Sequence, residues 1–449
     1  MGLIIGAGNT KPVFPYDYYY GVKIPLSVAA AGGLERVGRP ELHVSLPIQT
    51  RMRRCVLRDN GDVNYYLHPT NSTKKDTGAA ANLTGADGMV MVELPDHYGK
   101  FEFDGNNFTA LISEYALPGF HRVRKCYRSA YEATVDRTVA ATPKLASVVN
   151  TTAAFRGGNN NAAWDGTYRT LLGRPATAIS LTNFRAYARN RGNAGLNGAG
   201  WNCDLYEAQR TTYWLFVIEY ATRNCQTAIN PQPDANGYKQ GGLGSGCTTL
   251  NGTKWNDFNG YYPFIPCGIT NSLGNATGEV EFTMPSQYDS TTTTKVKVCS
   301  YRGIENPFGH IWSWTDGCLC LIQSNDDGSR SLFFTCDDPA LYGSSTASLA
   351  NYQGRGELPR TEGYVKTLMG GEFGENMPSE VGNGASSTAY YCDYFYTSLP
   401  TAGESLRGVL FGGSAHNGTP AGLSYALTDS APSNTYARIG SRLCFLPAA

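Results

Sequence analysis

The sequence predicts an α+β protein, with a β-rich N-terminal domain followed by a larger domain of two helices and irregular antiparallel strands. The chain has 449 residues, of which 41% are apolar and 16% charged, enough apolar material for the cores of two or three domains. Its 52 Gly and 29 Tyr indicate many tight turns, few long helices and strands rich in tyrosine. Apolar residues recur at helical spacing in only two long segments, so strands should dominate the rest.

Residues 41–140 are predicted to form the β-rich domain. The segment "LHVSLPI" at 42–48 alternates apolar and polar residues, as a strand does. "RMRRCVLRDNGDVNYYLHP" predicts a hairpin that turns at Asn60 and Gly61. Further strands are predicted at "MVMVELP", "GKFEFDG" and "FTALISEYALPGF". The preceding residues 1–40, rich in Gly, Pro and Tyr, are predicted to be an extended arm for attachment.

Residues 141–449 are predicted to contain both helices. "SLTNFRAYARNRG" should begin after a capping Ser180 or Thr182 and end at Gly192. "DLYEAQRTTYWLFVIEYATRN" has apolar residues at three-and-four spacing, which predicts a second helix. Short strands follow at "GEVEFTM", "KVKVCSYRG", "HIWSWTDGCLCLIQS" and "RSLFFTCDD".

The composition argues against several classes of function. Lys and Arg total 37, as do Asp and Glu, so the chain lacks the basic excess of a nucleic-acid binder. No run of 18 apolar residues is present, so we expect no membrane insertion. The 12 Cys are not in zinc-binding spacings. The first residues lack the basic region of a secretion signal, so we expect synthesis in the cytoplasm.

An ordered series of segments resembles bacteriophage tail-fibre proteins over residues 40–449. It comprises "GMVMVELPDHYGKFEF", "ISEYALPGFHRV", "YRSAYEAT", "NFRAYARNRG", "TYWLFVIEYATRNCQTAI", "NSLGNATG", "SYRGIENPFGHIWSWTDG", "SSTAYYCDYFY" and the closing "GGSAHNGTPAGL…IGSRLCF". The resemblance implies that residues 141–449 have a C-type-lectin-like fold, in the form shared with formylglycine-generating-enzyme-like domains. It also implies that 407–447 is the variable region of proteins diversified by a diversity-generating retroelement.

In such proteins the retroelement rewrites adenines in Asn-type codons, and the fold displays the changed side chains as a receptor-binding surface. Here the apolar segments 409–411 and 439–445 should be constant strands, and the residues between them should face solvent. Core positions do not tolerate such change, whereas surface substitutions cost within about 0.5 kcal/mol. The alternative is an ordinary polar loop without a partner. The positions that resemble the family's variable ones are Ser414, His416, Pro420, Ser424, Tyr425, Leu427, Asp429, Ser430, Tyr436 and Arg438.

Three further features have both a functional and a structural interpretation. Trp312 and Trp314 share one strand face, where they would stack on a ligand or pack in the core. His310 follows Glu305 in "IENPFGH" and is either catalytic or structural. "SNDDGSR" at 324–330 is either part of a Ca²⁺ site, as some C-type lectins have, or a hairpin turn. No nucleophile or metalloenzyme motif is present, so we expect neither an enzyme nor a cofactor other than Ca²⁺.

Together these observations predict a phage adhesin in the virion, at a tail fibre or tail tip. Its partners would be a host surface protein or glycan and other virion tail proteins. By analogy with fibre tips it would be a homotrimer, with avidity raised by multiple copies. Two alternatives remain open, a structural virion protein of the head or baseplate and an enzyme such as a depolymerase.

Overall fold

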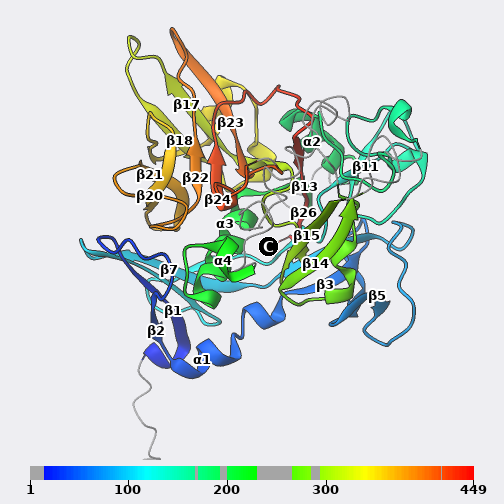
Figure 1. The fold of residues 1–449 in the computed structure, drawn as a ribbon, viewed down its shortest axis with the longest axis horizontal. Helices are drawn as coiled ribbons and strands as arrows, with labels where there is room; N and C mark the ends of the chain where they lie inside the picture. Colours follow the sequence, from blue (N-terminus) through cyan, green and yellow to red (C-terminus); the bar gives the residue numbers. More distant parts are fainter. Residues whose placement is uncertain are drawn as a thin grey trace, which may run out of the picture.

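The computed structural model describes residues 15–166, 170–192, 200–229, 265–284, 294–415 and 417–448. These residues form 26 strands and only four α-helices, arranged as sheets around a central helix (Figure 1). The predicted α+β class is therefore wrong, because the described part of the chain is mostly β. No helix within these ranges is long and apolar enough to cross a membrane.

A five-stranded antiparallel sheet contains residues that the sequence assigned to the attachment arm. Tyr20, Val22 and Ile24 in its second strand are fully buried, so this part of the arm belongs to the core. Residues 1–14 of the predicted arm lie outside the described residues. The sheet has the order β2-β1-β8-β7-β9, formed by β1 (Tyr19–Pro25), β2 (Glu35–Gly38), β7 (His97–Phe103), β8 (Asn107–Ser113) and β9 (His121–Val123).

A seven-stranded sheet joins the two halves of the chain. Its hairpin β3–β4 turns at the predicted Asn60 and Gly61, which is confirmed by the pairing of Leu57 with Val63. The last strand, β26, lies between β13 and β10, so one sheet crosses the predicted boundary at residue 140 and 41–140 is not a separate β-domain. The order is β13-β26-β10-β6-β3-β4-β5, formed by β3 (Arg53–Leu57), β4 (Val63–His68), β5 (Asn71–Lys75), β6 (Met89–Leu94), β10 (Cys126–Ser129), β13 (Gly200–Cys203) and β26 (Leu443–Leu446).

A nine-stranded sheet carries most of the C-terminal half. It is antiparallel except where β22 pairs with β24 and β17 with β25. Its order is β19-β18-β17-β23-β24-β22-β20-β21, with β25 beside β17, formed by β17 (Trp312–Gln323), β18 (Ser331–Thr335), β19 (Gln353–Glu357), β20 (Gly363–Gly370), β21 (Glu375–Val381), β22 (Tyr394–Tyr396), β23 (Glu404–Gly412), β24 (Gly422–Leu427) and β25 (Ile439–Ser441). Two smaller sheets contain β11 (Thr134–Asp136) with β12 (Lys144–Ala146), and β14 (Gly278–Met284) with β15 (Thr294–Tyr301) and β16 (Ile304–Glu305).

Both predicted helices are confirmed, as α2 (Leu181–Arg189) and α3 (Tyr206–Tyr220). Ser180 caps α2 by accepting a hydrogen bond from the backbone N–H of Asn183. Eleven of the 15 residues of α3 are buried, because α3 lies between the five-stranded sheet and the nine-stranded sheet and contacts both. A short helix, α4 (Cys225–Ile229), follows it.

The segment 42–48, predicted as a strand, instead contributes to α1 (Pro40–Ser45). Pro40 at its first turn is pre-organised for a helix, and Val44 is 86% exposed. The apolar alternation therefore did not mark a buried face. Seven 3₁₀ helices lie in the described connections, at Pro15–Tyr18, Gln49–Arg51, Ala153–Phe155, Ala162–Trp164, Ile269–Leu273, Pro339–Leu341 and Thr346–Asn351.

Candidate recognition surface

The apolar ends of the segment 407–447 form core strands, as the sequence predicts. Val409 and Leu410 in β23 are fully buried. At the other end, Ile439 in β25 pairs with Trp312 in β17, while β26 belongs to the seven-stranded sheet. Because the two ends are fixed in different sheets, the residues between them are held at both sides.

The ten predicted site residues do not all face solvent. Tyr436 is 41% exposed, and Pro420, Asp429 and Arg438 are partly exposed. His416 lies outside the described residues. The expectation of a solvent-facing side chain is wrong for the other five, which are buried, namely Ser414, Ser424, Tyr425, Leu427 and Ser430.

The burial of strand β24 explains why three of these five side chains do not face solvent. β24 lies between β23 and β22, so it is not an edge strand, and all six of its residues are buried. The helices α3 and α4 contact it, and their side chains bind its backbone. Gln209 donates to the carbonyl of Leu423, and Gln226 donates at 2.6 Å to that of Ala421, the residue just before β24. A polar side chain in such a strand must find its partner inside the protein.

Ser424 has such a partner in the buried carboxylate of Asp393. One Asp393 oxygen accepts hydrogen bonds from the Ser424 N–H at 2.7 Å and from its hydroxyl at 2.8 Å. The Cys225 thiol lies 3.8 Å from the other oxygen. Burial raises the pKa of Asp393 to about 7, although these hydrogen bonds oppose the shift. This site connects a predicted variable position to a carboxyl group that titrates near neutral pH.

Tyr425 belongs to a chain of aromatic rings that leads from the core to the surface. Its ring packs edge-on against buried Trp312, with the centroids 4.5 Å apart. On its other side it meets Tyr394 at 5.9 Å, and Tyr394 meets Tyr364 at 5.1 Å. Burial raises the pKa of Tyr425, with a smaller contribution from neighbouring tyrosines. Tyr396 follows on the same face of β22 as Tyr394 and is 36% exposed. We call Tyr364, Tyr394 and Tyr396, which lie outside the buried ring of Tyr425, the tyrosine surface.

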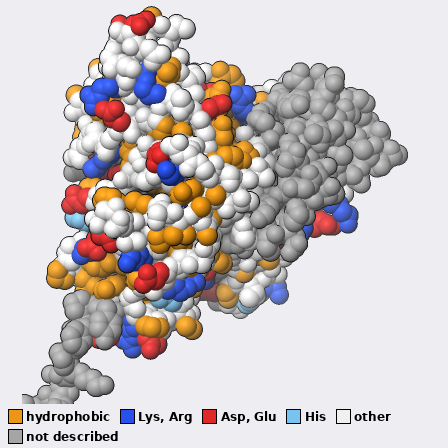
Figure 2. All heavy atoms as spheres, turned by 60° about the vertical axis from the view of Figure 1, so that its left-hand side comes forward, with side chains coloured by type: hydrophobic (Ala, Val, Ile, Leu, Met, Phe, Trp, Pro, Cys, Tyr) orange, Lys and Arg blue, Asp and Glu red, His pale blue; other side chains and the backbone are white. Residues whose placement is uncertain are grey.

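Tyr436 and Arg438 form a second exposed group, anchored to the same tryptophan. The Arg438 guanidinium lies over the Tyr436 ring, 4.9 Å from its centroid. The Tyr436 hydroxyl accepts a hydrogen bond from Asn434 at 2.8 Å. The backbone N–H of Trp312 donates to the carbonyl of Arg438 at 3.0 Å, so Trp312 contacts Arg438 as well as Tyr425. Figure 2 shows the face that carries β20, β21 and β7, where apolar side chains gather between interspersed acidic and basic ones.

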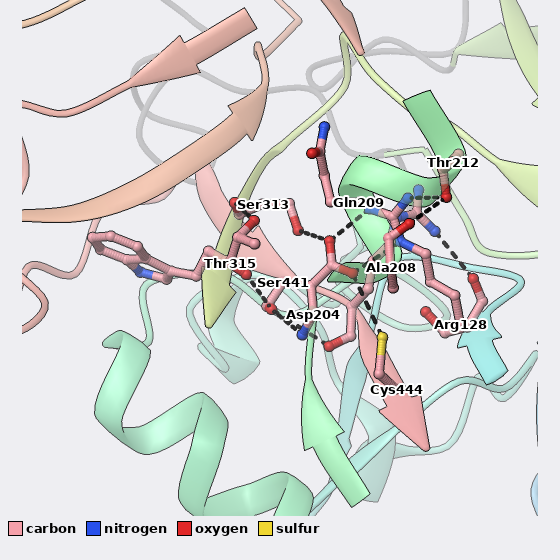
Figure 3. A network of polar contacts seen from close by, with 12 residues as sticks. Arg128, Asp204, Ala208, Gln209, Thr212, Ser313, Thr315, Ser441 and Cys444 are labelled. Carbon is pink, nitrogen blue, oxygen red and sulfur yellow. Dashed lines mark hydrogen bonds and ion pairs between the residues drawn. The ribbon is translucent and has the colours of Figure 1, made fainter. Parts of the chain in front are cut away.

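A buried polar network fixes the strands that carry these groups (Figure 3). Arg128 in β10 makes two hydrogen bonds to the carboxylate of Asp204, at 2.9 and 2.7 Å. Burial lowers the pKa of Arg128, but the charge and hydrogen bonds of Asp204, with smaller contributions from Cys444 and Cys126, together raise it, so the net shift is upward. Ser313 in β17 donates to the same carboxylate at 3.0 Å, and the Ser441 hydroxyl in β25 accepts from the Asp204 N–H at 3.3 Å. Through Asp204, the network therefore links β10 of the seven-stranded sheet to β17 and β25 of the nine-stranded sheet.

The structure also shows the surroundings of the two tryptophans, the histidine and the acidic segment that the sequence left with two interpretations. Trp312 and Trp314 are buried, as the packing interpretation predicts. His310 is buried and is bonded to Glu132, and its other ring nitrogen accepts the Ile265 N–H at 2.9 Å. The segment 324–330 connects β17 to β18 as a hairpin turn, in which Ser324 donates to Asp327 at 2.6 Å. Within the described ranges, no group of three or more His, Cys, Asp or Glu is arranged to hold a metal ion.

Comparisons with known proteins provide little further constraint. No protein-family model matches the sequence, and no curated protein matches it. Two solved structures, "Major Tropism Determinant U1 Variant" and "Major Tropism Determinant P3c Variant", align over 97% of this chain and 73% of theirs, at 13% identity and a TM-score of 0.27. A likeness at this level does not establish a shared fold, and the lectin-like domain with a separate N-terminal domain is not what the sheets form.

Proposed function

We propose that the protein is a bacteriophage adhesin that binds a host surface molecule through the tyrosine surface and the adjoining Tyr436–Arg438 pair. The observation that supports this most directly is the chain of rings from buried Trp312 through Tyr425 and Tyr394 to Tyr364, with exposed Tyr396 in the same strand as Tyr394. Tyrosine and arginine dominate the energetic centres of protein interfaces, because they offer large rigid contact areas with a polar end. The resemblance of residues 40–449 to tail-fibre proteins supplies the biological setting.

The proposed surface is pre-organised, which favours binding. Tyr394 and Tyr425 are held by ring contacts on both sides, and Arg438 is held over a ring and by its backbone. Such groups lose little conformational freedom when a partner binds. In the virion, several copies would raise the avidity of weak individual sites. Diversification by a retroelement would act on the exposed positions of this surface.

The test combines Tyr396→Ala with Tyr436→Ala in the full chain. Both side chains are exposed, so folding should be unchanged to within about 0.5 kcal/mol. Each truncation at an interface centre costs about 2 kcal/mol, or roughly 30-fold in affinity. We expect labelled protein to lose binding to intact cells of the bacterium that the virion infects, measured by flow cytometry.

The matched control is Tyr115→Ala, which removes a tyrosine that is 55% exposed at the end of β8, outside the proposed surface. This variant should bind cells as the wild type does. Cell binding that survives the double substitution would place the receptor site elsewhere. If wild-type protein neither binds cells nor competes with virion adsorption, the alternative of a structural virion protein is favoured.

A further inference from the structure

A polar cavity of about 470 Å³ lies away from the tyrosine surface. Its walls come from the β3–β4 turn, the loop 85–88, the β11–β12 hairpin and the C-terminal end of α2. In Figure 1, β11 and α2 lie on the right of the molecule, whereas β20 and β22 lie on the left. The volume is within the roughly 300–1,000 Å³ range of small-molecule sites.

The charges that line this cavity balance. Three cationic side chains and three carboxylates contribute to its walls, namely Arg58, Lys144, Arg191, Asp59, Asp87 and Asp136. An ion of either sign would meet like and opposite charges in equal number, and Asp59 is already paired with Arg191 and Lys144. The lining therefore offers no net electrostatic attraction to an anion or a cation. It suits a neutral ligand that offers both donors and acceptors.

The polar groups are already held in place by the protein. Arg191 is bonded to Asp59 and also donates to the carbonyl of Leu145. Arg58 donates to the side-chain oxygen of Asn64 at 2.7 Å. Because the side chains are positioned before any ligand arrives, little ordering cost would oppose binding.

Other contacts around the cavity hold further polar groups in place, and two lining residues are apolar. The Tyr65 hydroxyl donates to Asp87 at 2.9 Å, and Asn64 donates to the Asp87 carbonyl at 3.0 Å. Phe155 and Met89 also line the cavity, so an apolar face of a ligand would find an apolar contact. Small-molecule sites combine an apolar contact with a few placed polar groups in this way.

We propose that this cavity is a binding site for a neutral saccharide of mono- or disaccharide size. Adjacent hydroxyls of a sugar ring donate and accept hydrogen bonds together, which matches side chains of both kinds in one cavity. The C–H face of the ring would pack against Phe155. This inference does not depend on the tyrosine surface being the receptor site.

The experiment measures binding of glucose, galactose and N-acetylglucosamine to the full-length protein by saturation-transfer NMR and calorimetry. Glucuronate and glucosamine serve as anionic and cationic counterparts. We expect at least one neutral sugar to bind with a Kd at or below the millimolar range, as suits a single weak site. Both charged counterparts should bind at least 10-fold more weakly.

Two variants assign the site. Asn64→Ala removes a hydrogen-bonding wall group, and Asp136→Asn removes one carboxylate charge with almost no change of shape. Each should weaken sugar binding by 10-fold or more, while Lys125→Ala, which alters a different cavity of about 370 Å³, should leave it unchanged. The proposal is overturned if no neutral sugar binds, if a charged counterpart binds more tightly, or if both variants retain wild-type affinity. Cell binding by the Tyr396→Ala and Tyr436→Ala variant is measured separately, so the two proposals fail independently.

Discussion

Replacing Asp393 with Asn should make the protein progressively more stable than the wild type as the pH rises. Asp393 is buried, and its hydrogen-bond donors are the N–H and hydroxyl of Ser424 and the Cys225 thiol. An Asn side-chain oxygen can still accept both bonds from Ser424, but Asn cannot ionise. The substitution therefore removes a buried charge while it retains the local geometry.

The size of the effect follows from the shifted pKa. Burial raises the pKa of Asp393 from 3.8 to about 7 in the folded protein. Since each unit corresponds to about 1.4 kcal/mol, the ionised carboxylate costs the native state about 4 kcal/mol. The wild type has its full stability below about pH 4 and loses this contribution as the pH rises through 7. The variant should lose none of it.

The assay is urea unfolding of both proteins at intervals from pH 4 to pH 8. The difference in the free energy of unfolding, variant minus wild type, should rise by about 4 kcal/mol and then become constant above pH 7. Asp327→Asn is the control with the opposite sign, because hydrogen bonds from Ser324 and the Gly403 N–H lower the pKa of exposed Asp327. A difference for Asp393→Asn that is flat with pH, or that falls, would refute the assignment.

Substitutions at three other positions should separate the structural roles described above. Asp204→Ala leaves Arg128 buried without its carboxylate, so it should reduce the free energy of unfolding in urea by about 3–5 kcal/mol. Tyr425→Ala should cost about 3–5 kcal/mol because the ring is buried, whereas Tyr425→Phe should stay within about 1.5 kcal/mol; equal losses would contradict the packing role. Ser180→Ala removes the cap of α2 and should cost about 1 kcal/mol, with faster hydrogen exchange at the Asn183 amide.

Local signals in the sequence predicted local elements well. The capping Ser180, the apolar spacing of α3 and the Asn60–Gly61 turn each determine structure within a few residues, and each prediction is confirmed. The segment 42–48 shows the limit, because α1 is set by Pro40 and not by the alternation of apolar residues. Alternation predicts a strand only where one face becomes buried.

The fold class was not predictable in the same way, because it depends on pairings between distant residues. β26 pairs with β10 across more than 300 positions, Tyr127 lying opposite Phe445. No periodicity within either segment encodes that partner. The same holds for Arg128 and Asp204, whose buried ion pair has no signal in the sequence beyond a charged residue within an apolar segment.

The predicted site residues fall into two classes, buried and solvent-exposed, which composition alone could not distinguish. Serine and tyrosine occur both in exposed loops and in buried strands, so their presence in 407–447 left both outcomes open. In β24, Ser424 forms a hydrogen bond with Asp393, and the ring of Tyr425 packs against Trp312. Substitutions at either position would therefore alter the core. Tyr436 and Arg438 contact the frame mainly through their backbone, which leaves their side chains free to change at little cost to folding. Substitutions in the loop before β25 should therefore cost less stability than substitutions at the buried positions of β24.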